Sequence, residues 1–170
     1  MTAIGYGVAM FDPAPGPLPW DGHCRCDAVR FRVVAAPIAT AVCHCRGCQR
    51  MSSSAFSLTL MAPTGGVEIT RGELVPGGLP GGDLKHRCCD RCKTWVMTEI
   101  EAFGLLNVRA ALLDDAGWFV PFLETYRSTK LAWVTTPAVE RFDEFPEPAL
   151  YPQLLADYRA WARARGWPVG

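Results

Sequence analysis

The chain has 170 residues, 49% of them hydrophobic, with 17 basic and 17 acidic side chains. This composition fits one globular domain, or one domain with an appendage. The absence of a basic excess argues against generic binding to nucleic acid or to an anionic membrane. No apolar run approaches the roughly 20 residues that a membrane span needs, and we find no secretion signal. We therefore expect a cytoplasmic protein that does not enter a membrane.

Residues 1–21 are rich in Pro and Gly, which predicts a flexible N-terminal arm. Apolar side chains then alternate with arginines over residues 28–33. This alternation predicts a half-buried strand with Val29, Phe31 and Val33 on its inner face. Similar patterns predict further strands over residues 55–61, 67–69, 94–100, 105–111 and 129–134.

Polar and glycine-rich positions divide these strands. Within residues 55–61 the alternation assigns Ser57 and Thr59 to the polar face. Residues 76–83 hold four glycines and two prolines, a composition that a regular element does not tolerate, so we expect a loop there. The Asp-Asp-Ala-Gly run at 114–117 predicts a turn.

The C-terminal segment has a helical period instead. Apolar side chains recur on one face of residues 149–165, among them Leu155, Tyr158 and Trp161, and this predicts an amphipathic helix. We therefore expect a mainly β fold of antiparallel sheets with a C-terminal α-helix. In the corresponding domain division, a flexible arm (1–21) precedes a β domain (22–146), and a helix (147–170) packs on that domain.

The eight cysteines form three groups: Cys24 and Cys26; Cys43, Cys45 and Cys48; and Cys88, Cys89 and Cys92. In a reducing compartment such clusters indicate metal ligands or catalytic thiols, whereas a secreted chain would use them for disulfides. Two C-x-C units together with a C-x-x-C in one short neutral chain favour zinc. An iron–sulfur cluster is a less favoured use of the same cysteines.

Two of these groups together supply four thiolates. Cys24 and Cys26 are two residues apart, so on an extended chain both side chains point to the same side. Cys89 and Cys92 have the spacing of a zinc knuckle. A tetrahedral site of these four sulfurs would be closed and structural, because no position remains for a substrate. It would also link an early segment of the chain to a late one.

The middle group predicts a different kind of site. Cys43 and Cys45 share one side of an extended segment, and a turn at Arg46-Gly47 can bring Cys48 to the same ion. Three protein ligands with an exchangeable fourth position are typical of catalytic zinc. The alternative is a second structural site in which His44 or Cys88 supplies the fourth ligand. On an extended segment, however, His44 should point away from the ion that its neighbours share.

These motifs resemble those of the glutathione-dependent formaldehyde-activating enzyme family, which includes centromere protein V. The resemblance rests on residues 22–31 (GHCRCDAVRF), 43–56 (CHCRGCQRMSSSAF), 71–73 (RGE), 89–94 (CDRCKT) and 113–115 (LDD). It implies a β-tent fold around zinc, with two zinc ions per chain. The same resemblance implies a structural ion at Cys24, Cys26, Cys89 and Cys92 and a reactive ion at Cys43, Cys45 and Cys48.

The family's activity is carbon–sulfur bond formation between glutathione and formaldehyde, so the resemblance implies a carbon–sulfur lyase with glutathione as co-substrate. We expect Arg46 and Arg50 to offset the negative charge of the three-thiolate site or to bind a glutathione carboxylate. The alternative is a non-enzymatic zinc module that binds a thiol or a protein partner. The chain departs from the family at Ser53 and Lys93, where Gly is common, and at Cys88, which leaves an extra thiol beside the structural site.

Overall fold

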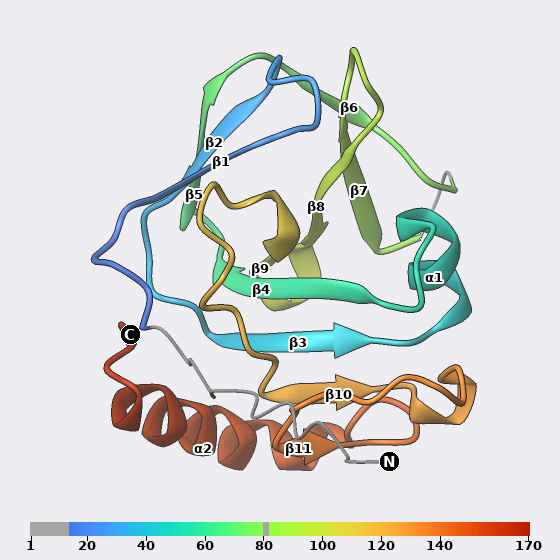
Figure 1. Cartoon of the computed structure of the whole chain (residues 1–170), viewed down its shortest axis with the longest axis vertical. Helices are drawn as coiled ribbons and strands as arrows, with labels where there is room; N and C mark the ends of the chain where they lie inside the picture. The colour runs from blue at the N-terminus through green and yellow to red at the C-terminus, as the bar shows by residue number, and fades with distance from the viewer. Residues whose placement is uncertain (1–13, 80–81) are drawn as a thin grey trace, which may run out of the picture.

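The computed structural model describes residues 14–79 and 82–170. Most of the predicted N-terminal arm, and residues 80–81 of the predicted loop, lie outside the described residues. Within these ranges the chain forms two β-sheets and a C-terminal helix (Figure 1). The predicted mainly β fold, a β-tent with a C-terminal helix, is confirmed. No helix of the described ranges is long and apolar enough to cross a membrane.

The smaller sheet has three antiparallel strands in the order β1-β2-β5. Its strands are β1 (Trp20–His23), β2 (Arg30–Val33) and β5 (Val67–Arg71). Phe31 and Val33 are buried and Arg32 is only partly buried, so the predicted faces of this strand are confirmed. Gly22 of β1 lies so close to the Phe31 ring and to the backbone of Leu112 that a Cβ would collide with both.

The larger sheet has eight strands in the order β11-β10-β3-β4-β9-β8-β7-β6. These are β3 (Ala39–Cys43), β4 (Ser57–Pro63), β6 (Leu74–Pro76), β7 (Leu84–Cys89), β8 (Trp95–Ile100), β9 (Leu105–Arg109), β10 (Leu123–Thr125) and β11 (Glu140–Arg141). Strand β10 pairs in parallel with both β3 and β11, so this edge of the sheet departs from the expected antiparallel arrangement. The other pairs are antiparallel.

Two sequence predictions about strands are wrong. The polar face of β4 is not exposed, because Ser57 and Thr59 are 2% and 4% accessible and face the interior. Residues 129–134 form no strand, because local backbone hydrogen bonds bend the chain there. The N–H of Lys130 donates to Arg127 and that of Val134 donates to Leu131. The predicted turn at 114–117 is present, and the Asp115 carboxylate accepts the N–H of Gly117.

The helices are few and short apart from the last one. A seven-residue helix, α1 (Arg46–Ser52), follows β3, and the C-terminal helix is α2 (Tyr151–Ala164). Four 3₁₀ turns complete the described elements: η1 (Glu101–Phe103), η2 (Ala110–Leu112), η3 (Arg127–Thr129) and η4 (Pro148–Leu150). Figure 1 shows α2 lying along the β10–β11 side of the molecule.

The predicted face of α2 packs into the core. Tyr158 is fully buried, with its ring 5.5 Å from that of Phe122 and 5.9 Å from that of Trp161. Beyond the helix Gly166 adopts a left-handed conformation (φ 71°), which suits a helix terminus. The chain then returns Trp167 to the core, 5.0 Å from Trp118. This contact joins the end of the described chain to its centre.

Candidate metal centres

The structure places seven of the eight cysteines in two clusters. One holds four sulfurs, from Cys24, Cys26, Cys89 and Cys92, and the other holds three, from Cys43, Cys45 and Cys48; within each, all sulfurs lie within 4.8 Å of one another. No disulfide joins any of the eight cysteines, all of which are described. Both clusters could therefore hold a metal ion, and this grouping is the one that the spacing predicts.

The four-cysteine cluster has the dimensions of a tetrahedral zinc site. A tetrahedron with Zn–S bonds of about 2.3 Å has sulfur–sulfur edges of about 3.8 Å. The Cys24 and Cys26 sulfurs are 3.6 Å apart, and those of Cys26 and Cys89 are 3.9 Å apart. The ligand set and the spacing both fit zinc. Four protein sulfurs close the coordination sphere, so this cluster suits a structural ion.

Hydrogen bonds around this cluster stabilise thiolates. The backbone N–H of Val29 donates to the Cys24 sulfur at 3.3 Å, and the Thr94 hydroxyl lies 3.1 Å from the Cys92 sulfur. Although burial opposes ionisation, the contacts with Thr94 lower the pKa of Cys92 to about 5. Lys93 closes the knuckle in a left-handed conformation (φ 57°), and its N–H donates to the Cys89 carbonyl.

Two of the sequence motifs outside the cysteines support the loop that carries Cys24 and Cys26. Arg71 binds both the backbone carbonyl and the carboxylate of Asp27. Gly72 has φ 77°, and a Cβ there would collide with the Ala28 carbonyl. Asp114 donates its N–H to the Asp21 carbonyl, at the base of the same loop. These motif residues therefore build the scaffold of the four-cysteine cluster.

The three-cysteine cluster forms where β3 passes into α1. Cys43 is the last residue of the strand, and Cys45 is the N-cap of the helix. The sulfur of Cys45 accepts the N–H of Cys48 at 3.3 Å, as a capping side chain does. Cys48 is brought to its neighbours by the first turn of this helix, where the sequence predicted only a turn at Arg46-Gly47.

Three thiols packed together cannot all ionise without a cation. The hydrogen bonds of Cys45 and Cys48 to Cys43, together with burial, raise the pKa of Cys43 well above its ordinary value. The same contact with Cys43, followed by that with Cys48, strongly lowers the pKa of Cys45. The three thiols therefore compete for ionisation. A divalent cation would remove this competition by allowing all three to bind as thiolates, so the donor set fits zinc.

His44 lies on the other face of the strand, as the alternation predicts. Its side chain is fully buried, and its Nε2 is 3.0 Å from an Oε1 of Glu124 on the neighbouring strand β10. Glu124 is also 3.5 Å from Lys130 and from Arg141. Neither His44 nor Cys88 joins either cluster. Among the described residues, the three-cysteine cluster has no fourth His, Cys or carboxylate donor within reach.

The two arginines predicted for substrate binding lie on α1. Arg46 is exposed, and its Nη1 donates to the side-chain oxygen of Gln49 at 2.7 Å. Arg50 is exposed in the last turn of the same helix. Cys88, in contrast, is buried against Gly77, where a Cβ would collide with the Cys88 sulfur. Burial raises the pKa of Cys88 and keeps this thiol neutral.

Sequence reasoning missed three polar residues beside the three-cysteine cluster. The hydroxyl of Ser57 is buried next to the Cys48 thiol. Contacts with Cys43 and then Ser57 oppose the rise in the pKa of Cys48 that Cys45 and burial cause. Burial and then the charges of Cys45 and Cys43 raise the pKa of Tyr126. Arg109 is 8% accessible. Burial lowers the pKa of Arg109 to about 10, and attraction to Cys48 and Cys43 opposes this lowering, so the guanidinium stays charged at neutral pH.

None of these three residues carried a signal that would place it beside the cluster. Arg109 lies in the strand predicted over residues 105–111, where Asn107 and Arg109 alternate with apolar residues and suggest a solvent-facing edge. The structure turns that face inward. Ser57 was assigned to a solvent-facing side for the same reason, and Tyr126 lies in a segment without any periodic pattern.

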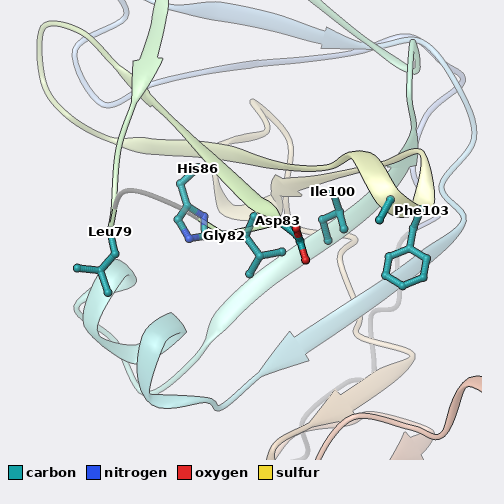
Figure 2. A pocket seen from close by; sticks show the side chains of 8 residues that line it. Leu79, Gly82, Asp83, His86, Ile100 and Phe103 are labelled. Carbon is teal, nitrogen blue, oxygen red and sulfur yellow. The ribbon is translucent and has the colours of Figure 1, made fainter.

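A cavity of about 540 Å³ lies beside β7. Figure 2 shows its lining, in which Leu79, Ile100 and Phe103 supply apolar surface and His86 is the partly buried polar group. None of the cluster cysteines lines it. His86 connects it indirectly to the interior, since its ring packs edge-on against Trp95 at 5.4 Å and its Nδ1 is 2.8 Å from the Thr98 hydroxyl.

Comparison with known proteins gives one family. The family model described as "Glutathione-dependent formaldehyde-activating enzyme" matches residues 19–129, more than half of the chain. The matched range contains both cysteine clusters. A crystal structure of a Rhodobacter sphaeroides protein is similar over 55% of this chain and 87% of that chain, with 21% sequence identity and a TM-score of 0.47.

Proposed function

Because this chain belongs to the glutathione-dependent formaldehyde-activating enzyme family, we propose that it is a zinc-dependent carbon–sulfur lyase. Its substrates are a small-molecule thiol, glutathione, and a small aldehyde, formaldehyde. In the forward direction the thiol sulfur forms a bond to the carbonyl carbon, and the carbonyl π electrons move to oxygen. The thiol proton ends on that oxygen, which gives S-hydroxymethylglutathione, and the reverse reaction returns both substrates.

The three-cysteine cluster is the proposed reactive centre, and the four-cysteine cluster is the proposed structural centre. A zinc ion at the first would lower the pKa of an incoming thiol and keep it as the nucleophilic thiolate. Cys43, Cys45 and Cys48 hold the ion on a rigid strand–helix junction. Arg46 and Arg50, exposed on the same helix, are proposed to meet the carboxylates of glutathione.

A single observation supports this proposal most strongly. Three sulfurs converge, and among the described residues no fourth protein donor lies within reach of them. Catalytic zinc sites keep such a position for an exchangeable ligand, whereas structural sites fill it. All eight cysteines are free, which agrees with a reducing compartment, and we propose the cytoplasm.

The test combines metal content with sulfur coordination. Zinc per chain is measured, and the number of sulfur ligands is determined by X-ray absorption at the zinc edge before and after addition of glutathione. We expect two zinc ions per chain, one of which gains a sulfur ligand when glutathione is added. We also expect faster formation of the adduct from glutathione and formaldehyde than in the uncatalysed reaction, which proceeds without an enzyme.

Two variants make the test specific. Cys45→Ser should lose turnover and one zinc ion while keeping the fold. Cys88→Ser, which changes a cysteine outside both clusters, should keep its turnover and its zinc content. Two zinc ions with four protein ligands each and no response to glutathione would overturn the enzyme proposal. That result would leave the alternative, a non-enzymatic zinc module that binds a protein partner.

A further inference from the structure

Arg109 is a buried cation without a carboxylate partner among the described residues. Arg109 is 8% accessible to solvent, and no Asp or Glu of residues 14–79 and 82–170 forms an ion pair with it. Its Nη2 donates to the Asn107 carbonyl at 2.9 Å, and its Nε is buried with no hydrogen-bond partner in these ranges. A buried charge is costly unless an opposite charge lies near it. The structure must therefore supply that charge in another form.

The strand register shows which groups share a face with Arg109. Arg109 on β9 pairs with Thr59 on β4, and two residues earlier on that strand Ser57 pairs with Cys43. Residues paired across a sheet point to the same side, as do residues two apart on one strand. Arg109 and Cys43 therefore project from the same face of the larger sheet, with only β4 between their strands.

The guanidinium is also fixed in place. Its central carbon lies 4.0 Å from the centre of the Trp95 ring, in cation–π geometry. The Trp95 indole N–H donates to the Met97 carbonyl and lies 3.1 Å from the Thr98 hydroxyl, so the ring cannot easily move away. A cation held in this manner acts on its neighbours as a fixed charge rather than as a flexible surface group.

Charge balance at the three-cysteine centre requires such a cation. A divalent metal with three thiolates carries one negative charge, and an added thiolate makes this two. A double negative charge in a partly buried site is unfavourable without a nearby positive charge. Arg46 and Arg50 are exposed, so water screens them, whereas Arg109 is buried.

We propose that Arg109 is the counter-charge of the three-cysteine centre and favours an anionic thiolate over a neutral molecule as its exchangeable ligand. Arg109 is thus a specificity-determining residue, and this role rests on the proposed function. When a thiol binds, its sulfur takes the exchangeable position and its proton passes to solvent, so the centre becomes more negative by one charge. The guanidinium stabilises that change.

The experiment uses the full chain loaded with Co²⁺, whose visible and near-ultraviolet absorption reports the number of sulfur ligands. The dissociation constants of glutathione, of 2-mercaptoethanol and of imidazole are measured at one pH for wild type, Arg109→Met, Arg109→Gln and Arg109→Lys. 2-Mercaptoethanol has no carboxylate, and imidazole binds as a neutral ligand. Arg87→Met is the matched control, since it removes a partly buried arginine that is paired with Glu99 on the same sheet.

Arg109→Met and Arg109→Gln should lower the affinity for both thiols by about 10- to 100-fold, as expected for the loss of one charge near a partly buried site. The affinity for imidazole should be unchanged or higher. Arg109→Lys should stay within about threefold of wild type, and Arg87→Met should match wild type. The absorption of the four-cysteine site provides the fold control in every sample.

Three results would overturn the proposal in different ways. Equal thiol affinities in wild type and in Arg109→Gln would show that the charge of Arg109 has no such role. Loss of affinity for glutathione alone would assign Arg109 to a substrate carboxylate instead. Failure of the wild-type protein to bind either thiol would overturn the proposed function together with this inference, whereas the first two results leave that function intact.

Discussion

Four non-glycine residues of the described chain have left-handed backbone conformations: Asp27, Ser53, Lys93 and Tyr126. Ser53 (φ 50°) is the residue after α1, and Lys93 (φ 57°) is the residue after Cys92. Both stand where the resembling family commonly carries glycine. At both positions an L-residue therefore takes on the steric cost of a conformation that glycine adopts freely, roughly 1–2 kcal/mol.

Replacement of Lys93 tests this cost directly. Lys93→Gly should have a free energy of unfolding about 1 kcal/mol higher than Lys93→Ala, since both lose the ion pair with Asp90 and only Gly avoids the Cβ clash. The difference corresponds to about 2–4 °C in melting temperature of the zinc-loaded protein. The same two substitutions at Arg91, which lacks a positive φ, provide the control. An equal gain from Gly at Arg91 would contradict the explanation.

At the scale of single residues, the sequence predicted how the cysteines group better than it predicted the residues around them. The two-residue spacing of Cys43 and Cys45 is a local property, so alternation was enough to separate them from His44. The positions of Arg109 and Glu124 depend on which strands become neighbours. That information lies in pairings between distant segments, which a periodic pattern in one segment does not contain.

Strand β3 illustrates why some elements were not predicted. Its sequence, Ala-Thr-Ala-Val-Cys, consists of residues with small side chains of similar size, and four of the five are buried. A strand buried on both faces has no alternation to detect. The reverse error occurred at residues 129–134, a segment that looks strand-like in sequence but whose backbone hydrogen bonds form turns.

Helix α2 was predicted because its period is strong and its ends carry Pro152 and Gly166. We expect Tyr158→Ala to lower the free energy of unfolding by about 3–5 kcal/mol, since it empties a fully buried aromatic site. Tyr158→Phe should cost less than about 1 kcal/mol or stabilise, because the buried hydroxyl has no hydrogen-bond partner in the described ranges.

Urea denaturation measures both changes. Arg159→Ala on the exposed face is the control, and its free energy of unfolding should stay within about 0.5 kcal/mol of wild type. If Tyr158→Ala behaved like this surface control, α2 would not be part of the cooperative core. The proposed division into a domain over residues 22–146 and a packed helix over 147–170 would then describe two independent units.

For the whole molecule, the four-cysteine cluster joins the two sheets. Cys24 and Cys26 follow β1 of the smaller sheet, whereas Cys89 and Cys92 lie at the end of β7 and beyond it in the larger sheet. An ion bound to all four would constrain both sheets at once. The three-cysteine cluster, in contrast, draws its ligands from β3, α1 and the link between them, so an ion there stabilises only a local junction.

This difference predicts two stages of metal removal. A mild chelator should first remove the ion of the three-cysteine cluster, which has a more open coordination sphere, with loss of thiol binding and little change in melting temperature. Removal of the second ion should lower the melting temperature by more than about 10 °C, because its binding free energy is part of the folding free energy. A zinc-sensitive dye monitors zinc release, and melting curves are recorded at both stages. Unfolding at the first stage would contradict this assignment.

Four tryptophans from distant parts of the chain meet in the core. The ring of Trp118 lies 4.7 Å from that of Trp20 and 5.0 Å from that of Trp167, which in turn is 4.9 Å from that of Trp161. A ribosome that adds about 5–20 residues per second needs roughly 7–30 s to pass from the first of these positions to the last. During that time the indole of Trp20 lacks part of the aromatic cluster that surrounds it in the folded protein. Strand β1 is therefore among the earliest parts of the described chain to be synthesised and among the last to be fully buried.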